Sequence, residues 1–160
     1  YFEKSILALR GYGNNETELR QIATERKLLG TKVFFLEPVD MDDLVPALNG
    51  ADIGVIPYKA VFLDHLLATP NKMFDGIASG KLIISNFQGW TKDIINQHEL
   101  GFIYDPSNLE EFREKLQPFM VDKGLLSKAK ISSRNLAAAE YSLKILGRKL
   151  EAFLADQRLN

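Results

Sequence analysis

The sequence contains no cysteine and only two histidines among its 160 residues. A disulfide scaffold, a thiolate zinc site and a cysteine nucleophile are therefore excluded, and a metal site built from histidines is disfavoured. No apolar run reaches the roughly 18 residues that a membrane-spanning helix needs. A signal-peptide pattern is also absent. These absences predict a soluble, cytoplasmic protein in which metal chemistry is not expected.

What is present is typical of a globular protein, with 46% hydrophobic and 26% charged residues. A chain of this length can bury one hydrophobic core, so we expect a single domain over residues 1–160. The net charge of −1 is unevenly spread: residues 1–121 hold 12 Lys+Arg and 17 Asp+Glu, whereas residues 122–160 hold eight and four. The basic C-terminal part fits a membrane surface, an acidic partner domain or a solvated helical face, and nucleic-acid binding is not indicated.

Short apolar runs alternate with helix-like stretches along the chain. Strands are expected at residues 6–9, 33–36, 52–56, 81–85 and 102–104, and an almost wholly helical stretch with a break near residues 139–141 closes the chain. Strands separated by helices indicate βαβ units. The prediction is an α/β fold with a Rossmann-like parallel sheet and helices on both faces.

Ligands of open parallel sheets bind outside the carboxyl ends of the strands, so the residues directly after each strand are candidates. Gly11 and Gly13 flank a tyrosine after the first strand and resemble the start of a dinucleotide fingerprint, although its third glycine is absent. This turn fits a tight bend with positive φ or a loop that a ligand approaches closely. A P-loop pattern is missing, which argues against a Walker-type nucleotide hydrolase.

A helix is expected to begin at Thr69 and the proline after it, because threonine caps free backbone N–H groups and proline fits the first helical position. Such a helix end suits a phosphate. Asn71 and Asp75 are four residues apart and share a polar flank, with Lys72 as the cation of the same turn. The Asp75 carboxylate could therefore accept hydrogen bonds from ligand hydroxyls, or it could cap a neighbouring loop beside a solvated Lys72.

Several motifs follow one another in a familiar order. They are the Gly-x-Gly turn, the Val-x-Phe strand at 33–35, Ala51-Asp52-Ile53 leading to Pro57-Tyr58, the run from Pro70 to Asp75, Gly80-Lys81, Gly89 with Asp93-Ile94-Ile95, and Gly101 before Asp105-Pro106. Over residues 5–155 this order resembles the C-terminal half of the glycosyltransferase group 1 family. The resemblance implies the B-type glycosyltransferase fold, in which two Rossmann-like domains face a cleft and the C-terminal domain binds the nucleotide-sugar donor. It also implies sugar transfer with retention, without an essential metal or other cofactor.

The resemblance places Asp75 at the second acidic position of the family's Glu-x7-Glu motif, whose carboxylate holds the ribose hydroxyls. The first acidic position, which contacts the donor sugar, falls on Leu67. Leucine cannot make that contact, and Asp64 could replace it only in a reshaped loop. Two features of the donor site therefore depart from the family pattern: the leucine, and a carboxylate at position 75 that is one methylene shorter.

The resemblance also implies the remaining donor-binding residues. Lys72, Asn71 and Thr69 would lie near the diphosphate. Backbone groups from Glu37 to Val39 would pass beside the base, while Gly11 and Gly13 would keep the floor of the cleft open. Gly89 would belong to a loop that faces the donor or the acceptor.

The family's paired Arg and Lys, and its N-terminal acceptor domain, come before the region that resembles this chain. We therefore expect a nucleotide-sugar-binding domain without its own first strand and without that acceptor domain, catalytic only in the full-length protein. The implied role is surface polysaccharide synthesis, with peripheral contact to the inner membrane surface. Alternatives are a non-catalytic nucleotide-sugar-binding or interaction module, and a sugar-nucleotide epimerase of related fold.

Overall fold

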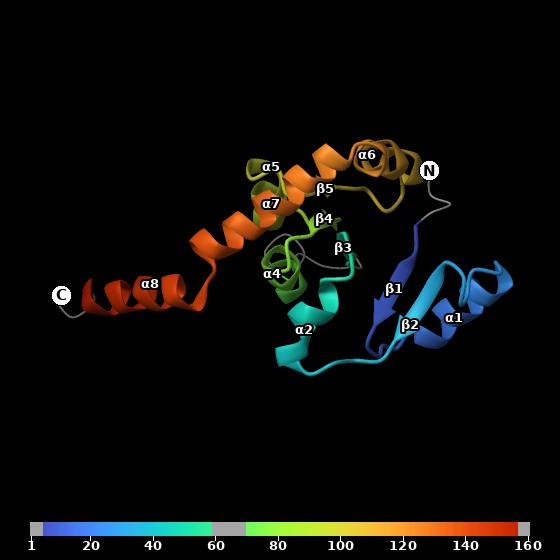
Figure 1. The fold of residues 1–160 in the computed structure, drawn as a ribbon, viewed down its shortest axis with the longest axis horizontal. Helices are drawn as coiled ribbons and strands as arrows, with labels where there is room; N and C mark the ends of the chain where they lie inside the picture. The colour runs from blue at the N-terminus through green and yellow to red at the C-terminus, as the bar shows by residue number, and fades with distance from the viewer. Residues whose placement is uncertain (1–4, 59–69, 157–160) are drawn as a thin grey trace. The chain divides into compact units, whose positions relative to one another are not determined.

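The structure, a computed structural model, describes residues 5–58 and 70–156. Strands and helices alternate through the first two thirds of the chain, and helices complete it (Figure 1). Every strand expected from the sequence is present to within a residue. The elements are β1 (Leu7–Arg10), α1 (Glu16–Glu25), β2 (Val33–Leu36), α2 (Met41–Leu48), β3 (Ile53–Ile56), α4 (Asn71–Ala78), β4 (Leu82–Ser85), α5 (Trp90–Gln97), β5 (Gly101–Ile103), α6 (Leu109–Val121), α7 (Lys123–Glu140) and α8 (Leu143–Asp156).

All strand pairs in the described part of the chain are parallel, and they form two sheets. One sheet pairs β1 with β2, and the other has the order β3-β4-β5. The sheets belong to two compact units, Tyr1–Ala47 and Leu48–Asn160. The α/β class and the parallel pairing confirm the sequence prediction, whereas the division of the strands between two sheets was not anticipated.

In the first unit, α1 packs against the two-stranded sheet. Ala23 of this helix is buried, and the Arg20 guanidinium lies 4.2 Å from the centre of the Phe35 ring. The periodicity of the sequence predicts a helix over about residues 17–29, whereas the helix in the structure ends at Glu25, four residues earlier. Its extension stops because Lys27 adopts a positive φ of 56°, which turns the chain out of the helix.

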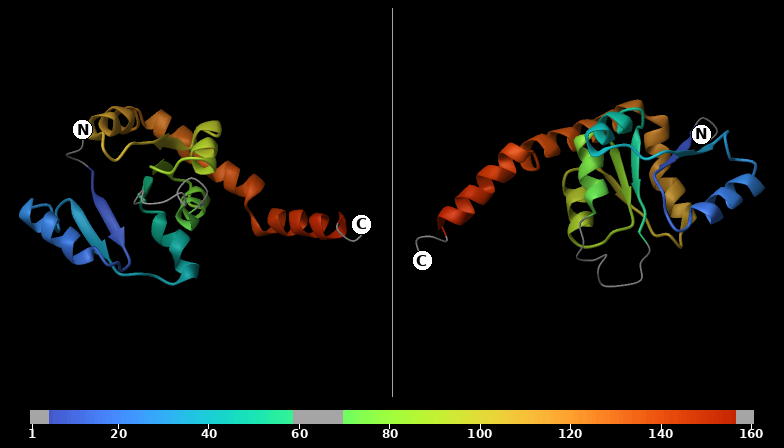
Figure 2. Two further views of the ribbon diagram at one scale, coloured as in Figure 1. Left: turned by 180° about the vertical axis from the view of Figure 1, so that it is seen from behind. Right: turned by 90° about the horizontal axis from the view of Figure 1, so that it is seen from below.

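In the second unit, β4 is the central and fully buried strand. Ile83 packs on one face of the sheet with side chains from α4, α5 and α7, while Leu82 and Ile84 pack on the other with side chains from α6 and α7. Alternate residues of a strand point to opposite faces, so three consecutive apolar residues require cover on both sides. The predicted two-sided helical cover is therefore confirmed for this unit (Figure 2).

Hydrogen bonds tie α7 to the amino end of this sheet. The buried Ser133 hydroxyl donates to the Lys81 carbonyl oxygen at 2.7 Å, and Lys130 Nζ lies 2.8 Å from an oxygen of Asp52. The helix then stops at Glu140, and α8 starts three residues later. The break expected near residues 139–141 is confirmed.

Candidate functional site

The sequence-predicted residues of the first unit lie together at the carboxyl ends of β1 and β2. The backbone N–H of Gly11 donates to the Leu36 carbonyl oxygen at 3.0 Å, and the Tyr12 hydroxyl donates to the Glu37 carboxylate at 2.5 Å. This hydrogen bond and the adjacent negative charge of Glu37 raise the pKa of Tyr12. The structure thus joins the Gly-x-Gly turn to the segment that begins at Glu37 and includes Val39.

The two glycines of this turn have different roles. Gly11 has a φ of +100°, which a residue with a side chain rarely adopts. Gly13 does not have a positive φ. A Cβ atom added at either position would meet no atom within 4 Å. The turn therefore needs a glycine at position 11 for its conformation, and both positions leave open space above the backbone.

In the second unit, α4 carries three of the predicted residues. The helix begins at Asn71 with Pro70 at its N-cap, one residue later than the sequence suggested, and no side chain among the described residues caps it. Asn71 and Lys72 are exposed in its first turn. Thr69, the fourth predicted residue of this segment, lies outside the described residues, as do Leu67 and Asp64.

Asp75 is the half-buried acidic residue of α4. Its neighbours Met73 and Ile77 are fully buried in the core, which fixes the orientation of the helix. Burial raises the pKa of the Asp75 carboxyl, and no hydrogen bond or ion pair to this carboxylate is found within residues 5–58 and 70–156. The Asp75 carboxylate is therefore partly desolvated, and its oxygens can still accept hydrogen bonds from a ligand.

The start of α5 lies beside α4. Gly89 is the N-cap of α5 with φ 59° and ψ −140°, and no side-chain cap bond is seen there. The next residue, Trp90, is 6.4 Å from Phe74 of α4 and 6.5 Å from Tyr141, measured between ring centres. Trp90 thus serves as a packing anchor that holds the two helix N-termini together.

The loops after β3 and β4 are locked to each other. The Asn86 side chain accepts a hydrogen bond from the Tyr58 N–H at 2.8 Å and donates one to the Tyr58 carbonyl oxygen at 2.6 Å. Ser85 Oγ donates to the Ile56 carbonyl oxygen and accepts from the Phe87 N–H, both at 3.2 Å. This network gives the carboxyl edge of the three-stranded sheet a defined shape.

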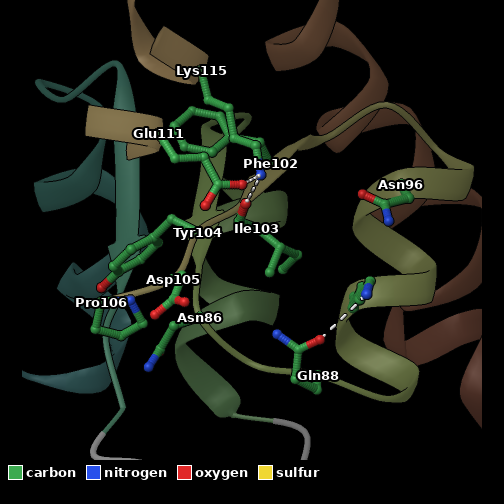
Figure 3. A pocket seen from close by; sticks show the side chains of 11 residues that line it. Asn86, Gln88, Asn96, Phe102, Ile103, Tyr104, Asp105, Pro106, Glu111 and Lys115 are labelled. Carbon is green, nitrogen blue, oxygen red and sulfur yellow. Dashed lines mark hydrogen bonds and ion pairs between the residues drawn. The ribbon is translucent and has the colours of Figure 1, made fainter. Parts of the chain in front are cut away.

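A polar pocket of about 480 Å³ opens next to this edge, between the ends of β4 and β5 and the helices α5 and α6 (Figure 3). Amides, carboxylates and ammonium groups share its wall with two aromatic rings and a proline. A pocket with both donors and acceptors suits a ligand rich in hydroxyl groups. Its lining residues are Asn86, Gln88, Lys92, Asn96, Phe102, Ile103, Tyr104, Asp105, Pro106, Glu111 and Lys115.

Some of these polar groups already have partners. Asp105 accepts hydrogen bonds from the N–H and hydroxyl of Ser107 at 2.8 and 2.7 Å, which lower its pKa. Lys115 donates to the Ile103 carbonyl oxygen at 2.8 Å and lies 2.5 Å from Glu111. The opposite wall of the pocket, on α5, is less constrained. Among the described residues, Lys92 there makes only a long hydrogen bond of 3.3 Å to Gln88.

Sequence reasoning selected residues 86–90 and Asp105 as strand-following segments but did not identify the pocket. Gln88, Lys92 and Asn96 are spaced by four residues, which is the signal of one polar stripe along a helix. That signal alone does not show what the stripe faces. The opposite wall of the pocket is formed by α6. The tertiary fold, and not the local spacing of residues, brings α6 to this place.

The described part of the chain has neither a cluster of metal-binding side chains nor a membrane-spanning helix. No group of three or more His, Asp or Glu side chains is placed to hold a metal ion. None of the described helices combines the length and apolarity needed to cross a membrane.

Comparison with known proteins identifies a family and a similar solved structure. The model of the family described as "Glycosyl transferases group 1" matches residues 3–122. The fold is similar to the C-terminal domain of a glycosyl transferase group 1 family protein (LpcC) from Francisella tularensis, with a TM-score of 0.57 and 18% identity. This match covers 80% of the chain and 63% of the other chain. No curated protein matches.

Proposed function

Because the chain belongs to the group 1 glycosyl transferases, we propose that its second unit binds a nucleoside diphosphate sugar at the N-terminal ends of α4 and α5. Glycosyl transfer is the general reaction of the family. The finer proposal is that this unit binds the donor, whose sugar passes to an acceptor with retention of configuration. Synthesis of a surface polysaccharide is the proposed role, at the cytoplasmic face of the inner membrane.

The observation that carries this proposal is the Asp75 carboxylate. It is half-buried, has no partner among the described residues and lies one turn from the uncapped N-terminus of α4. A carboxylate with open lone pairs accepts hydrogen bonds from two vicinal hydroxyls, which is the arrangement that a ribose offers. Desolvation of such a group costs free energy, and a ligand that donates hydrogen bonds offsets that cost.

The neighbouring groups suit a diphosphate. The first-turn N–H groups of α4 and α5 carry the positive end of each helix dipole, and Lys72 adds a full charge beside them. Gly89 has no side chain to obstruct a phosphate that approaches α5. When the bond to the sugar breaks, charge develops on the leaving diphosphate, and fixed dipoles and cations stabilise that charge without a metal.

The pocket that begins at Gln88, next to Gly89, supplies partners for the hydroxyls of the transferred sugar. Acceptor binding is assigned to a further domain of the full-length protein, together with the paired Arg and Lys of the family pattern. The chain alone is therefore expected to bind the donor without turning it over.

Ligand-observed NMR with UDP, GDP and ADP tests the donor site directly, because weak binding remains visible. Asp75→Ala should weaken binding of the preferred nucleotide by about 1–3 kcal/mol, since the ribose hydroxyls lose their acceptor. The matched control is Asp42→Ala, which removes an exposed carboxylate of α2 and should leave binding unchanged. Equal affinity of the folded Asp75→Ala variant and the wild type would remove Asp75 from the site.

A non-catalytic interaction module that has lost donor binding is the second candidate, favoured by Leu67 at the first acidic position. It predicts that neither the chain nor the full-length protein binds any of the three nucleotides. An epimerase of related fold would bind a nucleotide sugar and convert it without an acceptor. Analysis of the products made by the full-length protein separates that reaction from transfer.

A further inference from the structure

The loops that follow β1 and β2 place an exposed aromatic ring beside a carboxylate. Tyr12 is 76% exposed, and its hydroxyl donates to the Glu37 carboxylate at 2.5 Å. The last residues of the two strands, Arg10 and Leu36, are partners in the parallel register, which brings the two loops together (Figure 1). An exposed aromatic ring is a platform on which a planar group can stack.

Both the side chain and the backbone of Glu37 are held in place. The Tyr12 hydroxyl binds one carboxylate oxygen, Oε2, and the Arg10 guanidinium donates to the Glu37 carbonyl oxygen at 2.5 Å. The other carboxylate oxygen, Oε1, receives no hydrogen bond within residues 5–58 and 70–156. A carboxylate has about four acceptor sites, so both oxygens can still accept a hydrogen bond from a ligand.

The space and the charge around this pair suit an uncharged, flat ligand. A Cβ atom added at Gly11 or Gly13 would meet nothing within 4 Å, so the turn leaves room beside the ring. The negative charges of Glu37 and Glu16 both act on Tyr12 and raise its pKa. Two carboxylates disfavour a phosphate, whereas they favour a group that donates hydrogen bonds. In a nucleoside diphosphate, the flat and uncharged group with N–H donors is the base.

Guanine is the base that matches a carboxylate best. It presents a ring N–H and an amino group side by side on one edge, so each carboxylate oxygen can accept one hydrogen bond. Uracil places a single N–H between two carbonyl oxygens, and adenine places its amino group beside a ring nitrogen with a lone pair. With either of these bases, one carboxylate oxygen would face another acceptor and stay unpaired.

We propose that Tyr12 and Glu37 form a guanine-selective base site, so that the donor is a GDP-sugar. This inference rests on the proposed function, in which the chain binds a nucleoside diphosphate sugar. The Tyr12 ring stacks on one face of the base, and the Glu37 carboxylate accepts from the ring N–H and the amino group. Through its hydroxyl, Tyr12 is also the positioning residue of that carboxylate.

Ligand-observed NMR competition with the 160-residue chain tests the proposal, using GDP, IDP, UDP and ADP. GDP should bind at least about tenfold more tightly than UDP and ADP, because hydrogen bonds to a charged group contribute at least this factor. IDP differs from GDP only in lacking the amino group of the base. Its affinity should therefore lie between that of GDP and that of UDP.

Variants of the two side chains separate stacking from selection. Glu37→Gln should abolish the preference for GDP, because the amide keeps one acceptor and presents a donor to the donors of guanine. Tyr12→Ala should weaken all four nucleotides by about tenfold, since stacking on an aromatic ring does not depend on the base. Tyr12→Phe keeps the ring and should reduce only the preference for GDP. Glu18→Gln changes an exposed carboxylate of α1 and is the matched control, with wild-type ranking.

The same measurements distinguish failure of the base site from failure of donor binding. Asp75→Ala should weaken every nucleotide and leave their order unchanged. UDP or ADP binding as tightly as GDP, or a preference for GDP that survives Glu37→Gln, would overturn the guanine site while leaving the proposed donor binding in place. Absence of binding by all four nucleotides would overturn both. Circular dichroism checks that each variant is folded.

Discussion

Asp75 illustrates how a residue with a proposed binding role can lower the stability of the fold. Burial raises the pKa of its carboxyl, so the folded protein holds this proton more tightly than the unfolded chain does. Stability therefore falls as the pH rises through the interval between the unfolded and the folded pKa, and it remains lower at neutral pH. The charged carboxylate therefore lowers stability at neutral pH, as expected of a group kept for the proposed donor binding.

The variant Asp75→Asn should raise the melting temperature at neutral pH, because the amide is neutral and has nearly the same shape. The gain should shrink at about pH 4, where the wild-type carboxyl becomes protonated. The same variant should bind nucleoside diphosphates more weakly. Thermal unfolding at both pH values, with the NMR titration, measures these effects. A lower melting temperature at neutral pH would show that the carboxylate has a stabilising partner.

At the scale of elements, two glycines in ordered positions should respond in opposite ways to alanine. A Cβ on Gly101 of β5 would lie 1.9 Å from the carbonyl oxygen of Ile83, a backbone atom of the central strand that cannot move aside. Gly147 lies inside α8, where a Cβ would meet nothing within 4 Å. A side chain at position 101 would therefore clash with β4, whereas a side chain at position 147 would change only the helix propensity of α8.

Gly101→Ala should destabilise the second unit by about 1–3 kcal/mol or more, since β5 must separate from β4. Gly147→Ala should stabilise α8 by about 0.5–1 kcal/mol, because alanine loses less backbone entropy in a helix. Urea unfolding measures the first change and far-ultraviolet circular dichroism the second. Equal stability of the wild type and Gly101→Ala would contradict the close approach of the two strands.

The sequence predicts most elements because their signals are local. Apolar runs mark the strands, and the helical period of α4 predicts Met73, Phe74 and Ile77 on its core face. The structure buries Met73 and Ile77 and packs the partly buried Phe74 against them. The predicted end of α1 was wrong. The helix stops where Lys27 adopts a positive φ, and a lysine in the sequence does not indicate that conformation. The pocket wall from α6 was also missed, because residues such as Glu111 reach it only through tertiary packing.

At the scale of the whole molecule, the two units differ sharply in how much core they contain. Among described residues of the first unit, only Ala23 is buried, whereas the second unit contains both hydrophobic clusters. Pairing patterns within each sheet could not be derived from sequence, because strand runs alone do not specify which neighbours pair. The buried core of the described chain thus lies almost entirely in the second unit, so the first unit should open at a lower free energy.

Hydrogen exchange should show that the strands of the two units open at different free energies. Amides of β4, flanked by a strand on each side and buried on both faces, should exchange at least about tenfold more slowly than those of β1 and β2. The reason is that opening β4 exposes both clusters, whereas opening β1 exposes little apolar surface. Exchange measured by mass spectrometry on peptides from each strand tests this order. Equal protection of β1 and β4 would show that the units open together, so that the large core of one protects the other.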